Sequence, residues 1–507
     1  MNRTVLWLKR DLRLDDHEPL LEAARAGETV ALYVYEPIVY GAAEHDACHL
    51  GFINQCLTEL REELRERGGE LLVRHGPLPE VLDRLFEELP FDALRSHEET
   101  GLGATYARDR AVRRWARARG VRWIEHPQHG VVRPLASRNG WARLWNQRMS
   151  TPPVTAPGEL RTPPAVLSGA VAAGELMSAE RLRVAPTTVT ETQPGGSRAA
   201  REILRTFLYQ RGEFYQAEMS SPVEGWKGCS RISPHLAYGS ISLRRVAHDT
   251  RERRDELRQA GREASKWRGS IASFDKRLRW HCHFMQKLED EPPIEFRNFN
   301  RGFDGLRQED PGRWSEAEAG FFEAWRKGQT GYPMVDACMR CLATTGWINF
   351  RMRAMLVSFA AYHLWLHWKP VATELARRFL DFEPGIHFSQ CQMQSGVTGI
   401  NTVRIYSPIK QVQDQDPQGV FIRKWVPELR EVPDQHLPAP HLMPSLTQHM
   451  AGCEIGHHYP EPIVDHKTAY HQARERIFAV KSRPETRRHS DRVYEKHGSR
   501  RRPRPRR

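Results

Sequence analysis

Two arginines in an otherwise apolar helical segment are the residues whose type and spacing point most directly to chemistry. Arg351 and Arg353 lie in the stretch from Gly328 to Trp368, which reads GQTGYPMVDACMRCLATTGWINFRMRAMLVSFAAYHLWLHW. Guanidinium groups in such a setting could bind a phosphate-rich, anionic cofactor. The alternative is an ordinary pair of buried helices that carries a few satisfied charges.

The surrounding sequence predicts how these arginines are positioned. A Gly-Tyr-Pro turn places Pro333 at a helix start, Thr345 and Gly346 break that helix, and a second helix carries both arginines. Cys338 and Cys341 form a CxxC inside the first predicted helix. Since no second pair follows at ligand spacing, we expect buried thiols there and predict no metal site.

Composition limits the classes of protein to which the chain can belong. With 507 residues it suits two or three domains, and its net charge of +13 favours a polyanionic partner, although a generally basic proteome would have the same effect. The eight cysteines are scattered, which indicates no disulfide framework and a reducing cytoplasm. No apolar run reaches about 18 residues, so we expect no membrane partner.

The pattern of elements changes along the chain. Residues 1–130 alternate short apolar runs with amphipathic helical segments, which predicts a doubly wound parallel α/β domain, without the GxGxxG of a dinucleotide site. Residues 131–198, which are rich in Pro, Ala, Thr and Gly from about residue 150, are expected to form an interdomain connector that buries little surface. Residues 199–480 predict a large all-α domain, and the basic residues 481–507 a disordered tail.

Five segments resemble the DNA photolyase and cryptochrome family, in that family's order and across nearly the whole chain. They are VLWLKRDLRLDDHEPL, GCSRISPHLAYGSIS, the Gly328–Trp368 stretch, PIKQVQDQDPQGVFIRKWVPEL and YPEPIVDHKTA. The resemblance implies an FAD-binding helical domain and an α/β domain that carries an antenna chromophore, a folate or a deazaflavin.

The function implied by the resemblance is light-dependent repair of UV-damaged DNA. Cyclobutane pyrimidine dimers would be split by electron transfer from excited, reduced flavin, in a monomeric, cytoplasmic, nucleoid-associated enzyme. One alternative is a cryptochrome-like blue-light photoreceptor that acts on a signalling partner. A (6-4) photolyase and a nucleic-acid-binding protein without the chemistry are less favoured alternatives.

The resemblance also implies which residues bind FAD. His387 stands where the family has an Asn opposite flavin N5, so it could alter the flavin protonation state or could be a core histidine bonded to the backbone. Asp381 stands where a carboxylate pairs with Arg353, and Cys229 replaces a Thr of the phosphate-binding segment. The implied cofactor residues are Tyr215, Cys229, Ser230, Arg231, Ile232, Ser233, Arg353, Asp381, Phe382, Glu383 and His387.

Departures from the family pattern occur at the positions implied for electron transfer and for DNA binding. Cys391 and Met393 replace the two tryptophans of a Trp-Gln-Trp motif, which puts light-driven flavin reduction in doubt. Trp368 keeps the middle relay position, and Trp365, Trp347 and Trp325 are candidates for another route, or else plain core residues.

The predicted lesion pocket also combines residues that match the family with residues that depart from it. Trp280 matches the aromatic that stacks on a flipped-out lesion and, with His387, is the predicted catalytic residue. Arg351 is kept as well, whereas Met219, Arg277 and Phe350 replace an Arg, a Glu and an Asn or Asp. The DNA-facing set is therefore Arg277, Trp280, Phe350, Arg351 and Met393, in a pocket that departs from the standard one for cyclobutane dimers.

Overall fold

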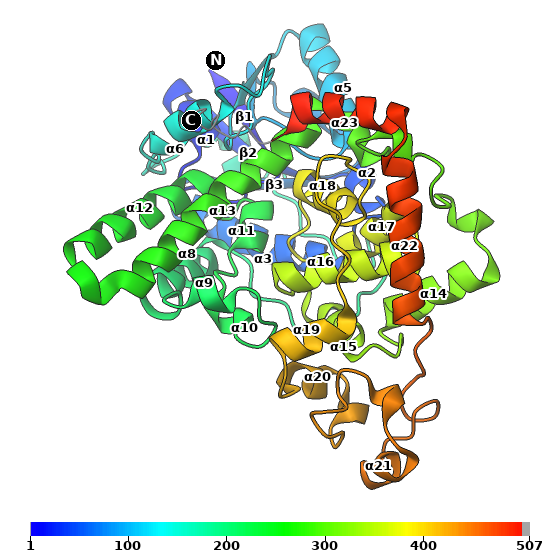
Figure 1. Cartoon of the computed structure of the whole chain (residues 1–507). Helices are drawn as coiled ribbons and strands as arrows, with labels where there is room; N and C mark the ends of the chain where they lie inside the picture. The colour runs from blue at the N-terminus through cyan, green and yellow to red at the C-terminus, as the bar shows by residue number, and fades with distance from the viewer. Residues whose placement is uncertain (1, 499–507) are drawn as a thin grey trace, which may run out of the picture.

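The computed structural model describes residues 2–498 and begins with a five-stranded sheet (Figure 1). All neighbouring strands are parallel, in the order β3-β2-β1-β4-β5. This order reverses on either side of β1, so the predicted doubly wound parallel sheet is confirmed. The strands are β1 (Arg3–Leu8), β2 (Glu28–Tyr35), β3 (Leu71–His75), β4 (Ala93–His97) and β5 (Arg122–His126).

Helices cover both faces of the sheet because alternate strand residues point in opposite directions. Leu6 and Leu8 pack with α1 (Glu18–Ala26) and α3 (Ala47–Arg65). Val5 and Trp7 pack on the other face, with α4 (Leu78–Glu88) and α5 (Gly103–Arg119). The short α2 (Pro37–Tyr40) follows β2. Strands buried on both faces explain the continuous apolar run of β1.

The segment predicted as a connector, residues 131–198, buries more than its composition suggests. It contains α6 (Trp141–Ser150) and α7 (Pro164–Leu167). Leu160 and Met177 are buried against the α/β core, and Trp145 is buried in the helical core. The expectation of little burial is wrong because isolated apolar residues of this segment reach the cores of both domains.

From residue 197 onward the described chain is helical. The first half comprises α8 (Ser197–Thr206), η1 (Phe207–Arg211), α9 (Tyr215–Glu218), α10 (Gly225–Gly228), α11 (Ser233–Ala237), α12 (Leu243–Gln259), η2 (Gly261–Ala264), α13 (Ser265–Asp290), η3 (Pro292–Glu295), η4 (Arg301–Phe303), η5 (Pro311–Arg313) and α14 (Glu316–Lys327). The second half comprises α15 (Pro333–Thr345), α16 (Phe350–Ser358), η6 (Phe359–His363), α17 (Trp368–Arg378), α18 (Pro384–Gln394), α19 (Pro408–Gln415), α20 (Val420–Trp425), η7 (Pro427–Leu429), η8 (Pro440–Leu442), α21 (Ser445–Met450), α22 (His466–Lys481) and α23 (Pro484–His497).

The helix pair α15 and α16 forms as the sequence predicts. Pro333 opens α15, and Gly346 ends it in the left-handed region with φ of 71°. An added Cβ at Gly346 would lie 3.1 Å from the Cβ of Leu380, so glycine is required there by space as well as by φ. Cys338 and Cys341 are both buried in α15. The break at Gly346 turns the chain so that α16 presents Arg353 to Asp381 in the segment after α17.

The C-terminal region differs from the expected disordered tail. Residues 484–497 form α23, where Val493 is buried and His497 Nε2 lies 2.6 Å from Glu291 Oε2. Asn300 Nδ2 also donates to the Thr486 carbonyl at 3.0 Å. A prediction from local charge misses these long-range contacts, and residues 499–507 lie outside the described part. Among the described residues, no helix is both long and apolar enough to cross a membrane.

Candidate cofactor site and DNA-facing surface

Arg353 and Asp381 form a two-pronged ion pair between α16 and the segment that follows α17. Arg353 Nη1 and Nη2 donate to the two carboxylate oxygens at 2.9 and 3.0 Å, and Nε donates to the Ile348 carbonyl at 2.8 Å. The Asp381 side chain is 4% exposed, and that of Arg353 is 23% exposed. Burial favours the protonated acid, but the attraction of Arg353 outweighs it and lowers the pKa of Asp381. The structure thus forms the pair that the family resemblance implied.

The segment Cys229–Ser233 lies beside this ion pair. Ser233 begins α11, and a hydrogen bond from its side chain also lowers the pKa of Asp381, after the larger effects of burial and Arg353. Arg211 fixes the segment from behind by donating to the carbonyl oxygens of Cys229 and Ser230, the latter at 2.7 Å. With these carbonyls already bonded, the segment is a pre-ordered backbone that leads into a helix start.

Arg231 is held in an unusual setting within this segment. Its φ of 58° is left-handed, and its guanidinium lies 4.2 Å from the Trp226 ring centroid and 4.0 Å from that of Trp347. Burial lowers its pKa to about 10, and its Nε is buried without a hydrogen-bond partner. A cation packed against two indole rings with an unsatisfied donor is suited to an anionic ligand.

Glu383 carries a contact that the sequence analysis did not include. It precedes α18 and pairs with Arg10, which lies just after β1 in the α/β domain. Burial raises the pKa of Glu383 although Arg10 opposes this, and Glu383 Oε1 is buried without a hydrogen-bond partner. The only sequence signal for Arg10 was its place in the opening KRDLR stretch. The contact joins the first domain directly to the predicted flavin site.

His387 is a neutral histidine bonded to the backbone. Its Nε2 donates to the Ala372 carbonyl at 2.7 Å, and Cys391 Sγ lies 3.7 Å from the same nitrogen. Burial lowers its pKa to about 4, which leaves the ring uncharged at neutral pH. Phe382 packs against it with ring centroids 5.3 Å apart. Since Nε2 carries the proton, Nδ1 is left as an acceptor.

Tyr215 and Ile232 are the remaining predicted cofactor residues, and the structure places Tyr215 in the core of the helical domain. It is 8% exposed and contacts the Phe207 ring edge-on at a centroid distance of 5.4 Å. Burial raises its pKa to about 12. Ile232 of the predicted set is buried in the same hydrophobic cluster, so both support the binding segment from within.

The predicted DNA-facing residues of α13 lie beside Met219, which also contacts the residue before α16. The Arg277 guanidinium lies 4.9 Å from the Trp280 ring centroid, and its Nη2 lies 3.6 Å from Met219 Sδ. Asn349 Nδ2 donates to the Met219 carbonyl at 3.1 Å, which ties α16 to the same patch. Trp280 is 51% exposed and Phe350 is 48% exposed. The patch therefore presents aromatic surface beside a cation, as base stacking requires.

Arg351 and Met393 lie in the helices next to this patch. Arg351 is half-buried on α16, and its Nε is buried without a hydrogen-bond partner. Met393 is half-buried near the end of α18. Both α13 and α16 pack against α18. The structure thus brings the helices of the predicted lesion residues together, and the positions of Arg351 and Met393 are consistent with that set.

Of the candidate electron-relay tryptophans, Trp368 has a chain of ring contacts toward the flavin side. It is fully buried, its Nε1 donates to Asn298 Oδ1 at 2.7 Å, and its ring centroid lies 6.3 Å from that of Phe388. The Phe388 ring in turn lies 5.6 Å from that of His387. Phe388, which the sequence analysis did not single out, therefore bridges the gap beside Cys391.

The other three candidates have different surroundings, and one of them, Trp347, packs against the Arg231 guanidinium. Trp325 is fully buried, with its ring 5.9 Å from that of Phe322, as a core residue would be. Trp365 lies between two cations, with the Arg307 and Arg476 guanidinium groups 4.5 and 4.9 Å from its ring centroid. Two adjacent positive charges oppose loss of an electron from that ring.

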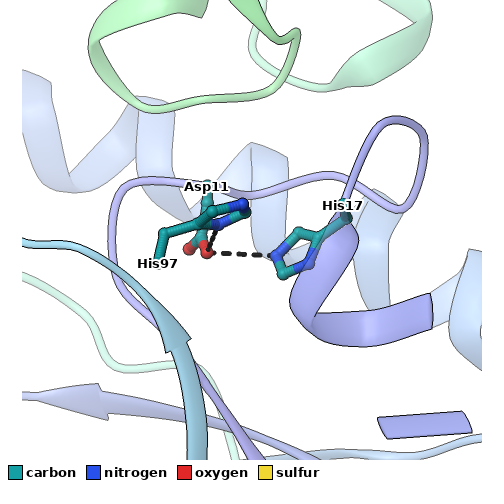
Figure 2. A group of neighbouring side chains, drawn as sticks. All are labelled: Asp11, His17 and His97. Carbon is teal, nitrogen blue, oxygen red and sulfur yellow. Dashed lines mark hydrogen bonds and ion pairs between the residues drawn. The ribbon is translucent and has the colours of Figure 1, made fainter. Parts of the chain in front are cut away.

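A buried Asp-His-His group stands at the carboxyl edge of β1 and β4, where the sheet order reverses (Figure 2). Asp11 Oδ2 lies 2.6 Å from His97 Nδ1 and 3.0 Å from His17 Nε2. Burial would raise the pKa of Asp11, but hydrogen bonds from both histidines hold it well below its usual range. His17 Nδ1 accepts from the Leu20 amide at 3.2 Å, so its Nε2 carries the proton. Three hydrogen-bonded groups explain this cluster better than a metal site does.

The residues of the predicted flavin site fit a bound FAD. Glu383 Oε1 and Arg231 Nε are buried and unpartnered, which costs free energy unless a ligand pairs with them. Both lie on segments next to the Arg353–Asp381 pair. An acceptor and a donor of this kind match the imide edge and the phosphates of a flavin dinucleotide.

Comparisons with known proteins agree with this arrangement. Residues 4–141 match the family model described as DNA photolyase, and residues 274–479 match the model described as the FAD binding domain of DNA photolyase. A deoxyribodipyrimidine photo-lyase of Streptomyces griseus is 30% identical over 92% of this chain and 97% of its own. A cryptochrome DASH of Gloeobacter violaceus is 28% identical over 91% and 93%. The crystal structure of a class III photolyase from Agrobacterium tumefaciens superposes with a TM-score of 0.81 at 25% identity, covering 95% of this chain and 98% of that one. The chain therefore belongs to the DNA photolyase and cryptochrome family and carries that family's FAD-binding domain.

Proposed function

We propose that this protein is a light-dependent, FAD-dependent DNA photolyase that splits cyclobutane pyrimidine dimers. The observation that carries the proposal is the exposed Trp280, with the Arg277 guanidinium 4.9 Å from its ring, on the helical domain that also holds the Arg353–Asp381 pair. An exposed indole beside a cation provides a surface on which a flipped-out base can stack. The net charge of +13 supports binding to a polyanion.

Each part of the site has a separate task in this proposal. When bound, FAD supplies the light-excited electron donor of the reaction. Arg353 and Asp381 hold the isoalloxazine side, and Arg231 with Ser233 neutralises and orients the phosphates. His387, fixed as the Nε2–H tautomer by the Ala372 carbonyl, presents an unprotonated Nδ1 at neutral pH.

Burial around the cofactor residues keeps water out of the site. Glu383 and His387 are 4% and 8% exposed, and Phe388 behind them is fully buried. In a dry site, charges and dipoles act at low effective dielectric, so their positions have larger effects than in water. Trp280 and Arg351 would seat the dimer at the edge of this dry region.

Specific substitutions favour a second candidate function, a cryptochrome-like blue-light photoreceptor. Met219 and Arg277 contact each other through sulfur and guanidinium at 3.6 Å, at positions where the family uses an Arg and a Glu to address DNA. One cryptochrome DASH is similar over nearly the whole chain. A receptor would use the same flavin site and pass its change to a partner protein instead of repairing DNA.

Binding to defined lesions distinguishes these functions. The flavin-loaded protein is titrated in the dark with single- and double-stranded oligonucleotides that carry one thymine dimer, one (6-4) product or no lesion. If the protein is a cyclobutane photolyase, we expect it to bind the dimer at least tenfold more tightly than undamaged DNA. Equal affinity for all three would support the receptor, and a preference for the (6-4) product would change the substrate.

A further inference from the structure

A pocket of about 490 Å³ opens on the surface between α6, α12 and α13, and none of its lining residues belongs to the predicted cofactor set. α12 packs against α13, which follows it closely in the sequence, and against α6, which comes from a much earlier part of the chain (Figure 1). Four arginines line the pocket, namely Arg143, Arg251, Arg254 and Arg279, together with a single carboxylate, Asp275. The pocket thus has an excess of three positive charges.

The arginines are mostly bonded to neutral groups. Arg254 Nη1 pairs with Asp275 Oδ2 at 3.3 Å, and it alone of the four forms an ion pair within the described part of the chain. Arg279 Nη2 donates to Asn146 Oδ1 at 3.0 Å, and Arg251 donates to the Met149 carbonyl. Neutral acceptors orient a guanidinium without cancelling its charge.

The pocket is floored by a buried aromatic ring and contains an N–H donor that has no hydrogen-bond partner. Trp145 is 1% exposed beneath it, and the Arg279 guanidinium lies 5.2 Å from the Trp145 ring centroid. Arg254 Nε is buried without a hydrogen-bond partner. Burial lowers the pKa of Arg251, and repulsion from Arg254 and Arg279 adds to this against the attraction of Asp275. An anion in the pocket would reduce the repulsion between the arginines. It would also accept hydrogen bonds from their unpaired N–H groups.

The position of the pocket on α13 indicates which anion this is. Arg279 directly precedes Trp280, so their Cα atoms are about 3.8 Å apart. Lys276 is exposed one helical turn earlier, between the Trp280 side of α13 and its Arg279 side. A strand whose base stacks on Trp280 would therefore carry its neighbouring phosphates over Lys276 toward the four arginines.

We propose that this four-arginine pocket binds phosphodiester groups of the DNA that flanks the lesion, an inference that rests on the proposed function. Guanidinium forks match phosphate oxygens bidentately, so they fix the position of the strand without reading its sequence. The pocket sets affinity and salt dependence, whereas the Trp280 patch sets lesion preference.

The test is the salt dependence of DNA binding by the flavin-loaded protein. In the double variant Arg143→Gln/Arg279→Gln, the slope of log K against log salt falls by about 1.8, since each lost phosphate contact removes about 0.9. Affinity for undamaged and dimer-containing duplexes falls by the same factor. Arg143 is exposed, so Arg143→Gln alone gives a fall of about 0.9 without risk to the fold.

The double variant Arg301→Gln/Arg313→Gln is the matched control, because it removes the same charge from exposed sites on η4 and η5. It is expected to leave the slope unchanged. The inference is overturned if the pocket variant and the control have the same slope while the wild type still prefers the dimer. Tight binding of inorganic phosphate by the wild type with no change in the DNA slope would overturn it in favour of a small anion. A wild type with no preference for the dimer would instead contradict the proposed function.

Discussion

The Arg353–Asp381 pair predicts a large loss of stability when the arginine is replaced by a neutral residue. In Arg353→Gln the carboxylate of Asp381, only 4% exposed, would lose its cation. Breaking a buried pair in this way costs about 3–5 kcal/mol because an uncompensated charge stays in the interior. We therefore expect the free energy of unfolding at pH 7 to fall by about 3–5 kcal/mol.

A second pair in the same domain provides a matched control. Arg340 Nη1 contacts both carboxylate oxygens of Glu428 at 2.8 Å, and its Nε donates to the Gly328 carbonyl at 3.0 Å, as Arg353 Nε does to Ile348. The Glu428 side chain is 30% exposed, so water can solvate it if the arginine is lost. Arg340→Gln is therefore expected to cost only about 0–1 kcal/mol.

The assay is urea unfolding of the flavin-free proteins, followed by circular dichroism, so that cofactor binding does not add to the difference.

The pH dependence of the stability difference is a further check. In the wild type the pKa of Asp381 is lowered, so its stabilisation is complete above the unfolded value of about 3.9 and is lost as pH falls below it. In Arg353→Gln the buried acid would have a raised pKa, so the gap from the wild type narrows on acidification. Equal losses in Arg353→Gln and Arg340→Gln at pH 7 would refute this reasoning.

Three further predictions concern the aromatic patch, the buried histidine and the electron route. Trp280→Ala is expected to weaken binding to dimer-containing DNA by about 1–3 kcal/mol without changing its salt slope, as measured by fluorescence anisotropy. His387 has a pKa lowered to about 4, so the stability it provides is complete above the unfolded pKa of about 6.5 and is lost as pH falls toward 4. His387→Asn is therefore expected to reduce the loss of stability over that range by up to about 3 kcal/mol, and identical pH profiles would contradict this. Trp368→Phe is expected to slow light-driven flavin reduction more than Trp365→Phe does, and the reverse order in absorbance kinetics would contradict the route through Phe388.

Local patterns predicted the elements, and the family resemblance predicted the main ion pair of the site. Pro333 and Gly346 mark the bounds of α15, because a fixed φ and a left-handed φ are properties of single residues. The resemblance to the family placed the Asp381 carboxylate beside Arg353, and the structure forms this pair. The two residues lie in separate segments, so local periodicity alone does not predict their contact.

Features that depend on contacts between distant elements could not be predicted. Arg10 reaches Glu383 only because the two domains dock in one orientation, which no periodicity encodes. The low pKa of His387 follows from its burial under α17, and the order of α23 follows from buried Val493. Charge and composition describe a segment in water, whereas these properties are set by what packs against it.

One measurement tests the central claim most directly, namely the loss of thymine dimers from an oligonucleotide under blue light. The flavin-loaded protein is first reduced chemically, so that the replacement of a relay tryptophan by Cys391 has no effect on the result. We predict that dimers disappear with repeated turnover in the light and stay intact in a dark control, and that Trp280→Ala repairs more slowly at limiting DNA. Intact dimers after illumination, with reduced flavin still bound, would contradict the proposed function.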